Sequence, residues 1–345
     1  MRHRLNRIVF ALVAVLCAIG TSLPALAATD YLYVPCVNNL VIIDCTTDTI
    51  VKTIKYNDYI VGCTPSPDGK RFYMNSWKSI YVVDTESNKL LDKIPFFTDL
   101  NRVIINAGIA VSADNNYMYM SVSITKKKLN IPKLNVLPPQ LIVYDLRKKE
   151  MVKNFEIPTN CGAVVTLRGD PDHVALMAQD IYKFNLKDGK MTKLLGLLHP
   201  EPGQPPLNSL VFWNNWSPGD HGIFVSQAYS PEHMYYILID KMGKLTLLQA
   251  QDFVMMYSCI LSPDTKYIYG VMDEVYKIDA KTGKTLAMDP VARGTCYACA
   301  MTSDGKKLYL GPAGPDISVY DTATMKCTGY ISLPADGVVM NRISK

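Results

Sequence analysis

One phrase recurs along almost the whole chain after residue 27. Each copy has a short apolar segment, a turn of the Ser-Pro-Asp-Gly type, a Tyr-rich segment, and an apolar segment that ends in Asp before a charged turn. The turn occurs at 66–70, 112–116, 262–266 and 302–306, with weaker copies at 168–172 and 217–220. In repeat proteins each such unit buries its apolar face against its neighbours, so the sequence predicts an array of similar small units.

The polar residue that ends the last apolar segment of each copy gives the number of copies. It stands at Asp44, Asp84, Asp145, Asn185, Asp240, Asp279 and Asp321, at intervals of 40, 61, 40, 55, 39 and 42 residues. A period of about 40 residues is typical of four-stranded β-propeller blades. Insertions at 125–139, and at 199–206 together with 228–234, account for the two long intervals. The sequence therefore predicts a seven-bladed β-propeller with four antiparallel strands per blade.

Local chemistry agrees with an all-β fold. In the Ser-Pro-Asp-Gly turns, Pro sets φ and Gly takes the position of positive φ. Alternating runs such as 81–83 and 317–320 favour half-buried strands, and no helical period of useful length follows residue 27. The Asp at each strand end is expected to accept hydrogen bonds from the backbone of the next turn.

The two ends of the chain predict how the ring closes. Residues 30–56 supply three outer strands without an inner strand before them, and the tail 337–343 follows the seventh copy. We expect this tail to pair with the N-terminal strand in one blade. The alternative, an open stack of sheets, would leave two exposed edges that invite aggregation.

The first 27 residues are typical of a cleaved signal peptide. Basic residues precede an apolar run at 8–19, and Ala25-Leu26-Ala27 offers small residues at a cleavage site. The run is shorter than a membrane span, although an uncleaved anchor is the alternative. A compact signal of this kind is typical of bacteria. We therefore expect residues 28–345 to form one propeller domain in the periplasm.

Composition narrows the choice of partners. Hydrophobic residues make up 48% of the chain, which excludes a disordered chain. Removing the signal peptide removes three Arg and no acid, so the net charge of +5 falls to +2. A balance this small does not suggest binding to nucleic acid, to acidic partners or to a membrane.

Eight cysteines remain after residue 27. Three of them, Cys63, Cys259 and Cys299, share one place in the repeat, five residues before the turn Asp, and are interpreted as small buried hydrophobes. The other five are candidates for disulfides, with the pairing left open: Cys36, Cys45, Cys161, Cys296 and Cys327. The Cys-Tyr-Ala-Cys motif at 296–299 lies on a predicted strand and lacks the following His that covalent haem attachment needs.

No catalytic, cofactor-binding or metal constellation emerges from the sequence. The four histidines of the mature chain, His173, His199, His221 and His233, fall in predicted turns or insertions without metal-ligand spacing. The Asp-Pro-Asp run at 170–172 could hold calcium but is better read as a turn. A phosphate loop and a nucleophile elbow are both absent.

Aromatic residues recur at one level of the predicted inner strands. Tyr257 and Tyr297 stand seven residues before the turn Asp, and Phe212 has the matching place in the blade before. Asp252 and Phe253 lie just before one of these strands. Two interpretations stay open: these residues form a wall of a cavity for a substrate or partner, or they pack around the central channel.

Three stretches carry a family resemblance: LNSLVFWNN at 207–215, FVMMYSCILSPD at 253–264, and residues 295–334. With them the chain resembles the beta subunit of quinohemoprotein amine dehydrogenases, within the wider group of YVTN-type propellers. The resemblance in length and blade order runs over nearly all of 28–345.

The resemblance implies a periplasmic heterotrimer that deaminates primary amines to aldehydes. In that family a small subunit holds a cysteine tryptophylquinone, an alpha subunit carries two c-type haems, and the beta propeller clasps the small subunit and helps to enclose the amine site. The catalytic groups belong to the partners, so none is assigned to this chain. We expect the lone chain to be colourless and inactive, with a partner interface above about 1,600 Å².

Two other functions compete with this one. A stand-alone periplasmic propeller could bind a peptide, glycan or protein without catalysis. An independent propeller enzyme with its own metal or cofactor is disfavoured by the scarcity of His and of clustered acids.

Overall fold

The computed structural model describes residues 28–208, 217–291, 293–312, 314–337 and 339–345. These residues form strands joined by turns and loops, and no helix occurs among them. Accordingly, the described part of the chain contains no helix that could cross a membrane. The predicted signal peptide, residues 1–27, lies outside the described residues.

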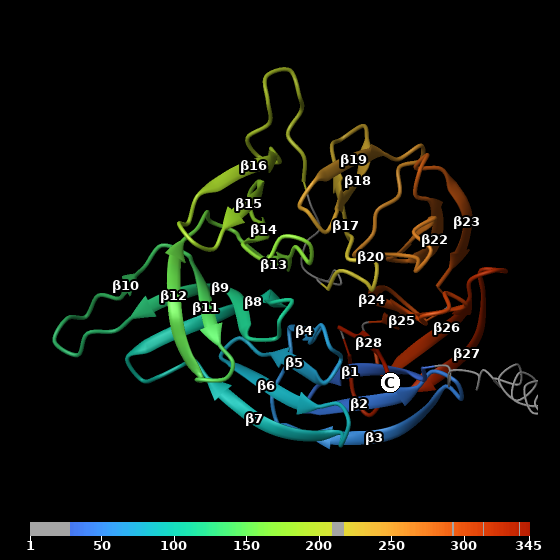
Figure 1. Cartoon of the computed structure of the whole chain (residues 1–345). Coiled ribbons are helices and arrows are strands. Elements are labelled where there is room, and N and C mark those ends of the chain that lie inside the picture. Colours follow the sequence, from blue (N-terminus) through green and yellow to red (C-terminus); the bar gives the residue numbers. More distant parts are fainter. Residues whose placement is uncertain (1–27, 209–216, 292, 313, 338) are drawn as a thin grey trace, which may run out of the picture.

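Six sheets contain the strands (Figure 1). The first two sheets have four strands each. They are β28 (Asn341–Ser344), β1 (Asp30–Cys36), β2 (Asn39–Asp44) and β3 (Thr49–Lys55), then β4 (Gly62–Pro65), β5 (Arg71–Asn75), β6 (Ser79–Asp84) and β7 (Lys89–Pro95).

The third sheet has nine strands. One group contains β8 (Asn101–Val111), β9 (Tyr117–Lys126), β10 (Asn135–Val136), β11 (Gln140–Asp145) and β12 (Glu150–Glu156). The other contains β13 (Ala163–Thr166), β14 (His173–Met177), β15 (Ile181–Asn185) and β16 (Met191–Leu195). A single parallel pairing, Ala163 with Gly108, joins the two groups, so each group is otherwise a separate antiparallel unit.

The last three sheets complete the arrangement. The three-stranded sheet contains β17 (Phe224–Tyr229), β18 (Met234–Ile239) and β19 (Leu245–Gln249). The two four-stranded sheets contain β20 (Ser258–Leu261), β21 (Tyr267–Val271), β22 (Glu274–Asp279) and β23 (Thr285–Pro290), then β24 (Cys296–Met301), β25 (Lys307–Pro312), β26 (Asp316–Asp321) and β27 (Lys326–Ser332). Figure 1 shows the sheets arranged around a common centre, with β4, β8, β13, β20, β24 and β28 on the inner side.

The two ends of the described chain pair with each other, as the sequence predicted. Strand β28 runs antiparallel to β1, with Tyr31 opposite Ile343. Two further backbone hydrogen bonds of 2.8 and 2.9 Å join Thr29 and Lys345. The first sheet is therefore built from both ends of the chain.

The repeated polar residues act within their own turns. The side-chain oxygen of Asp44 accepts a hydrogen bond of 2.7 Å from the N–H of Thr46, and that of Asn185 accepts one of 2.8 Å from Lys187. The same bond from a turn N–H is present at the other five marked positions. The expectation that these residues close the following turn is confirmed.

The Ser-Pro-Asp-Gly turns also have the predicted backbone. Gly69 and Gly305 take positive φ values of 69° and 72°. The same place in two other copies is held by Asn115 at 59° and by Thr265 at 61°. A β-branched residue is strained in this region, so the third of these turns stores strain that the glycine copies avoid.

The core lies between neighbouring sheets. One apolar cluster combines Leu32 and Ile43 of the first sheet with Ala300 and Ile317 of the last. A buried tyrosine of the last sheet, Tyr309, donates a hydrogen bond of 2.7 Å to Asp48 after β2. Six of the seven apolar clusters of the described residues draw on two sheets, and the seventh joins the two groups of the nine-stranded sheet. Packing between neighbouring units therefore builds the core.

The cysteines are part of this core. All eight cysteines after residue 27 are free thiols, so the interpretation of five of them as candidate disulfides is wrong. Cys36, Cys45, Cys161 and Cys296 are buried and Cys327 is partly buried, and burial raises the pKa of the first four thiols to about 12. They pack as small hydrophobic side chains. Cys63, Cys259 and Cys299 are buried as predicted.

Candidate functional site

The antiparallel order of the strands gives the molecule two different faces. Connections from an outer strand to the next inner strand lie at one end of the strands, which we call the connecting face. It comprises the described residues of 56–61, 96–100, 157–162, 196–207, 250–257, 291–295 and 333–340, with the hairpin turns 76–78 and 127–139. The opposite end, the turn face, carries the Ser-Pro-Asp-Gly turns and the segment 217–222.

Tyr257 and Tyr297 meet at the connecting face. Their ring centroids are 5.1 Å apart with an interplanar angle of 56°. The backbone N–H of Tyr257 donates a 2.9 Å hydrogen bond to Val271, which holds this residue at the start of β20. Tyr297 packs against the cluster that contains Val339. Phe212, the third aromatic predicted at this level, lies outside the described residues.

Asp252 and Phe253 lie elsewhere on the same connection. They line an open hollow of about 480 Å³ beside β22 and β23, where Asp252 accepts a 3.3 Å hydrogen bond from the N–H of Thr285. The Phe253 side chain is 51% exposed. The sequence candidates therefore divide into a tyrosine contact and a separate outer hollow, and their role in binding stays a prediction.

A second hollow on the connecting face was missed by sequence reasoning. Its volume is about 500 Å³, and Trp77, Asn106, Gln179 and Leu198 are among its lining residues. These residues come from the second sheet and from both groups of the third sheet. No repeat phrase marks them, because each lies in a connection or bulge that differs from copy to copy.

A wide bulge in β8 builds one wall of this hollow. Ile105 pairs with Val122 and Ile109 with Met120, so residues 106–108 bulge out of the ladder opposite Ser121. The Asn106 amide donates hydrogen bonds to Ser121 Oγ at 3.1 Å and to the Cys161 carbonyl at 2.8 Å. The wall is therefore tied to both groups of the nine-stranded sheet.

Glycine is required where this bulge meets the second sheet. A Cβ atom on Gly62 would lie 1.7 Å from the Ala107 carbonyl oxygen. That oxygen belongs to backbone and cannot move as a flexible side chain would. The close approach of β4 to the bulge thus depends on the absence of a side chain at position 62.

Several large apolar side chains on the connecting face are exposed to solvent. Apart from the 127–139 hairpin, six of them in the described chain are between 40% and 51% exposed: Tyr59, Trp77, Phe97, Leu100, Leu198 and Phe253. Of the exposed large hydrophobic residues that the structure describes, only Met242 belongs to a hairpin turn at the opposite end. Exposed apolar groups concentrated at one face are typical of binding surfaces.

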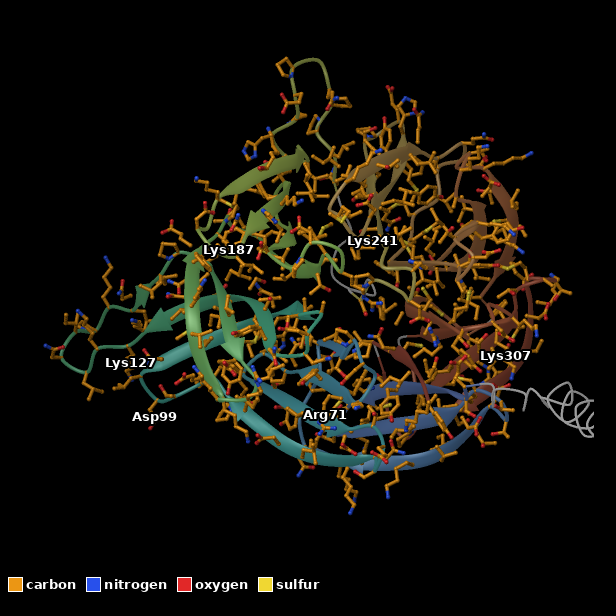
Figure 2. The ribbon with its side chains drawn as sticks, in the orientation of Figure 1. Arg71, Asp99, Lys127, Lys187, Lys241 and Lys307 are labelled. Atoms are coloured by element: carbon orange, nitrogen blue, oxygen red, sulfur yellow. The ribbon has the colours of Figure 1, made fainter. Side chains whose placement is uncertain are left out.

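An arm extends this surface. Residues 127–139, which include the short strand β10, project from the sheets (Figure 1), and Figure 2 labels Lys127 on this arm. Four aliphatic side chains on it are exposed: Leu129, Ile131, Leu134 and Val136. No acidic residue occurs between 125 and 139, whereas four lysines do.

His199 makes a structural contact. His199 Nδ1 lies 2.9 Å from the buried carboxylate of Asp180, which also accepts backbone N–H bonds from 197–199. Burial raises the pKa of Asp180, but these hydrogen bonds outweigh burial and hold it below its usual value. The carboxylate anchors the start of the 197–207 connection.

The Asp-Pro-Asp run is a turn, as predicted. Asp170 pairs with His173 at 2.8 Å and with Lys183 at 2.7 Å. His173 is the first residue of β14, so the prediction that it lies in a turn is wrong: it follows the turn directly. Within the described ranges, no group of three or more His, Cys, Asp or Glu side chains could hold a metal ion.

Comparison with known proteins identifies the fold. No protein-family model and no curated protein matches the chain. A functionally unknown protein from Desulfotomaculum acetoxidans is similar in structure, with a TM-score of 0.60 and 12% identity over 91% of this chain and 98% of that one. Apo AztD from Citrobacter koseri is similar as well, with a TM-score of 0.59 and 13% identity over 92% of this chain and 98% of that one.

The hydrazine synthase of Kuenenia stuttgartiensis gives a TM-score of 0.57 at 15% identity, over 81% of this chain and 88% of that chain. These neighbours are propeller-like proteins. The likeness at such low identity shows the fold alone. This chain has an all-β, propeller-like fold built from antiparallel sheets.

Proposed function

We propose that the chain is a closed seven-bladed propeller that acts as a non-catalytic subunit of a periplasmic amine dehydrogenase. The seven marked hairpins, the pairing of β28 with β1 and the single bridge within the nine-stranded sheet support seven units. In this proposal β8–β12 and β13–β16 are two blades. The three-stranded sheet is a further blade, and Tyr229 at the end of β17 also forms an isolated β-bridge with Asn208.

The exposed apolar residues of the connecting face carry the functional proposal. Trp77 and Leu198 are about half exposed and also line the 500 Å³ hollow. Burying such side chains under a partner contributes roughly 1.5–3 kcal/mol each, before the entropy lost on association. A docked protein would both cover this surface and close the hollow.

The chemistry assigned to the partners fits this geometry. Quinone-dependent deamination needs a cavity that excludes water while the substrate is bound to the cofactor. A rigid sheet edge can hold the walls of such a cavity in place. The quinone belongs to the small subunit and the c-type haems to the alpha subunit, so this chain supplies a wall and a docking surface without holding either group.

The alternative is a stand-alone periplasmic propeller that binds a peptide, glycan or protein without catalysis. It is supported by the same exposed apolar residues of the connecting face, because a partner other than a redox subunit could also cover them. Both functions use the connecting face. They differ in whether redox subunits accompany the chain.

Co-purification separates the two functions. The full chain, tagged and expressed in its native host, should bring down a haem-staining subunit and a small polypeptide that is positive in a quinone stain. A tagged chain that elutes alone and colourless would support the alternative, and amine dehydrogenase activity from the lone chain would contradict both.

Matched variants test the surface itself. Trp77→Ser combined with Leu198→Ser should weaken capture of both subunits at least tenfold. Leu91→Ser combined with Met288→Ser removes side chains that are 53% and 55% exposed on outer strands, and should leave capture unchanged. Equal loss in both pairs would mean that the connecting face is not the docking surface.

A further inference from the structure

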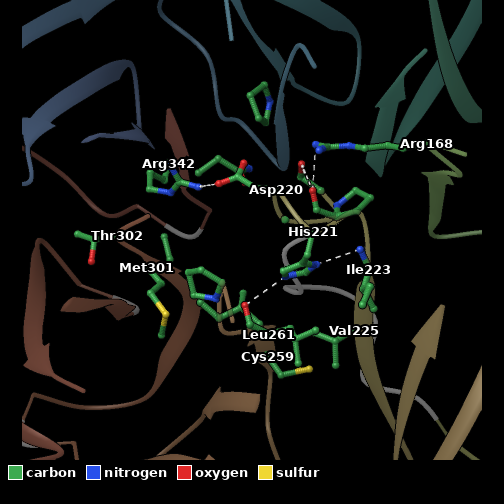
Figure 3. Close-up of a pocket in the computed structure, with 18 residues that line it drawn as sticks. Arg168, Asp220, His221, Ile223, Val225, Cys259, Leu261, Met301, Thr302 and Arg342 are labelled. Carbon is green, nitrogen blue, oxygen red and sulfur yellow. Dashed lines mark hydrogen bonds and ion pairs between the residues drawn. The ribbon is translucent and has the colours of Figure 1, made fainter. Parts of the chain in front are cut away.

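A small pocket of about 110 Å³ lies at the turn face, among the inner strands (Figure 3). Its lining residues come from several sheets and include Arg168, Asp220, His221, Thr302 and Arg342. We call it the turn-face pocket. It lies at the opposite end of the strands from the connecting face, so the proposed docking function does not use it.

One arginine of the pocket, Arg342, is held between two carboxylates. The Arg342 guanidinium forms ion pairs with Asp30, at 3.0 Å, and with Asp220, and it donates a further hydrogen bond to Ser344. Its side chain is 15% exposed. Arg342 is thus held in a fixed position at the wall of the pocket.

The other arginine has spare donors. Among the described residues Arg168 has one hydrogen-bond acceptor, the Pro218 carbonyl at 3.2 Å from Nη2, although a guanidinium carries five N–H donors. Burial lowers the pKa of Arg168, and the nearby Asp220 carboxylate opposes this. A partly buried cation with free donors gains stability from an added anion.

Asp220 occupies the space between the two arginines (Figure 3). It contacts Arg342 directly and acts on Arg168 through its charge, yet its side chain is 71% exposed. An exposed carboxylate can leave this position at low cost, because water solvates it well. Asp220 therefore resembles an internal anion that a ligand can replace.

His221 adds no charge to the pocket. Its Nδ1 accepts a 3.0 Å hydrogen bond from the N–H of Ile223, and its Nε2 lies 3.5 Å from the Leu261 carbonyl. This arrangement assigns the proton to Nε2. Burial also lowers the pKa of His221, which favours the neutral ring. Together with Asp30 behind Arg342, the charges around the pocket are two arginines and two aspartates, so departure of the exposed Asp220 side chain leaves a net positive charge.

We propose that the turn-face pocket binds a small oxyanion, a carboxylate or a phosphate, through Arg168 and Arg342, with Asp220 as the competing internal anion. The guanidinium fork matches the paired oxygens of such groups. A volume near 110 Å³ suits a group of the size of acetate or phosphate.

Calorimetric titration of residues 28–345 tests the site. Sodium acetate and sodium phosphate are titrated separately, with sodium chloride holding the ionic strength constant. We expect saturable binding of at least one of them. Acetate alone would identify a carboxylate site and phosphate alone a phosphate site. Saturable binding of neither would overturn the proposal.

Three variants assign the binding to the named groups. Arg168→Gln should weaken binding at least tenfold, and Asp220→Asn should tighten it at least threefold by removing the competitor. Arg71→Gln, which removes a surface arginine paired with Asp84, should leave the affinity unchanged. Wild-type affinity in Arg168→Gln, or no gain in Asp220→Asn, would refute the site.

Arg168→Gln could destabilise the fold, and Arg168→Lys provides a second measurement. It keeps the charge but loses the two-donor fork, so we expect binding weaker than in the wild type. Binding of equal strength would show that the guanidinium of Arg168 is not the ligand group.

Discussion

Asp30 joins three distant parts of the chain, and its replacement gives a direct measure of how the chain ends are held. One carboxylate oxygen accepts hydrogen bonds from Arg342 at 3.0 Å and from Ser344 Oγ at 2.6 Å. The other accepts from the N–H of Ser303 at 2.6 Å and from its hydroxyl at 2.8 Å. The side chain is only 8% exposed.

The magnitude follows from the chemistry of the amide. In Asp30→Asn an NH₂ group replaces one carboxylate oxygen. The two hydrogen bonds to that oxygen are lost, and the protein groups that donated them then point at the NH₂ group, which is itself a donor. Hydrogen bonds to a charged group contribute about 1.5–3 kcal/mol each, and breaking one member of a buried ion pair costs about 3–5 kcal/mol. We expect the free energy of unfolding to fall by about 3 kcal/mol.

Urea unfolding of residues 28–345 measures this change as a shift in the midpoint at constant m-value. Asp92→Asn is the matched control, since Asp92 also joins two neighbouring strand groups through Lys149 but its side chain is 32% exposed. The control should lose less than about 1 kcal/mol. A loss in Asp30→Asn no larger than in the control would refute the view that Asp30 holds the two ends together.

Three further predictions concern acid, strain and close packing. Burial raises the pKa of Asp30, but hydrogen bonds from Ser344 and Ser303 and the charge of Arg342 outweigh burial and lower the pKa below 3.8. The stabilisation by the Asp30 carboxylate is therefore full above about pH 4 and is lost as the pH falls through the folded-state pKa. The difference in unfolding free energy between wild type and Asp30→Asn, measured in urea, should shrink from pH 6 to pH 3, and a constant difference would contradict this. Thr265→Asn should raise the melting temperature and increase the free energy of unfolding by about 0.5–1 kcal/mol, because Asn tolerates a φ of 61° better than Thr. Gly305→Thr should lower the melting temperature and decrease the free energy of unfolding by about 1–2 kcal/mol. Shifts of the same sign would exclude backbone strain as the cause. Gly62→Ala should lower the free energy of unfolding, measured in urea, by more than about 3 kcal/mol, because the added Cβ would clash with the Ala107 carbonyl. Gly329→Ala is the control: its added Cβ would have no atom within 4 Å, so the free energy of unfolding should change by less than about 0.5 kcal/mol.

Much of the fold was predictable because its signals are local. A turn with Gly69 needs only four residues in a row to define its geometry, and Asp44 closes its turn with the N–H groups of the next residues. The hydrogen bond that closes the turn recurs at all seven marked positions, so the spacing of these residues reveals the repeat. The pairing of residues 341–344 with β1 followed from counting strands in the first and last copies.

The candidate site was less predictable, because it depends on how copies differ. Tyr257 and Tyr297 occupy equivalent places in two copies, and the structure brings their rings together. Asp252 and Phe253 stand only a few residues before Tyr257, yet the connection turns them to the outer hollow. Sequence distance along an irregular loop does not determine the direction of a side chain.

The sequence alone thus determined the repeated unit, its turns and the meeting of the chain ends, since each rests on short-range patterns. Only the tertiary structure decided that Trp77 and Leu198 share a hollow, and that Arg168, Asp220 and Arg342 surround one pocket. These groups lie far apart in the chain. They meet because sheets packed around a centre bring the same end of every inner strand to one place, which no local pattern records.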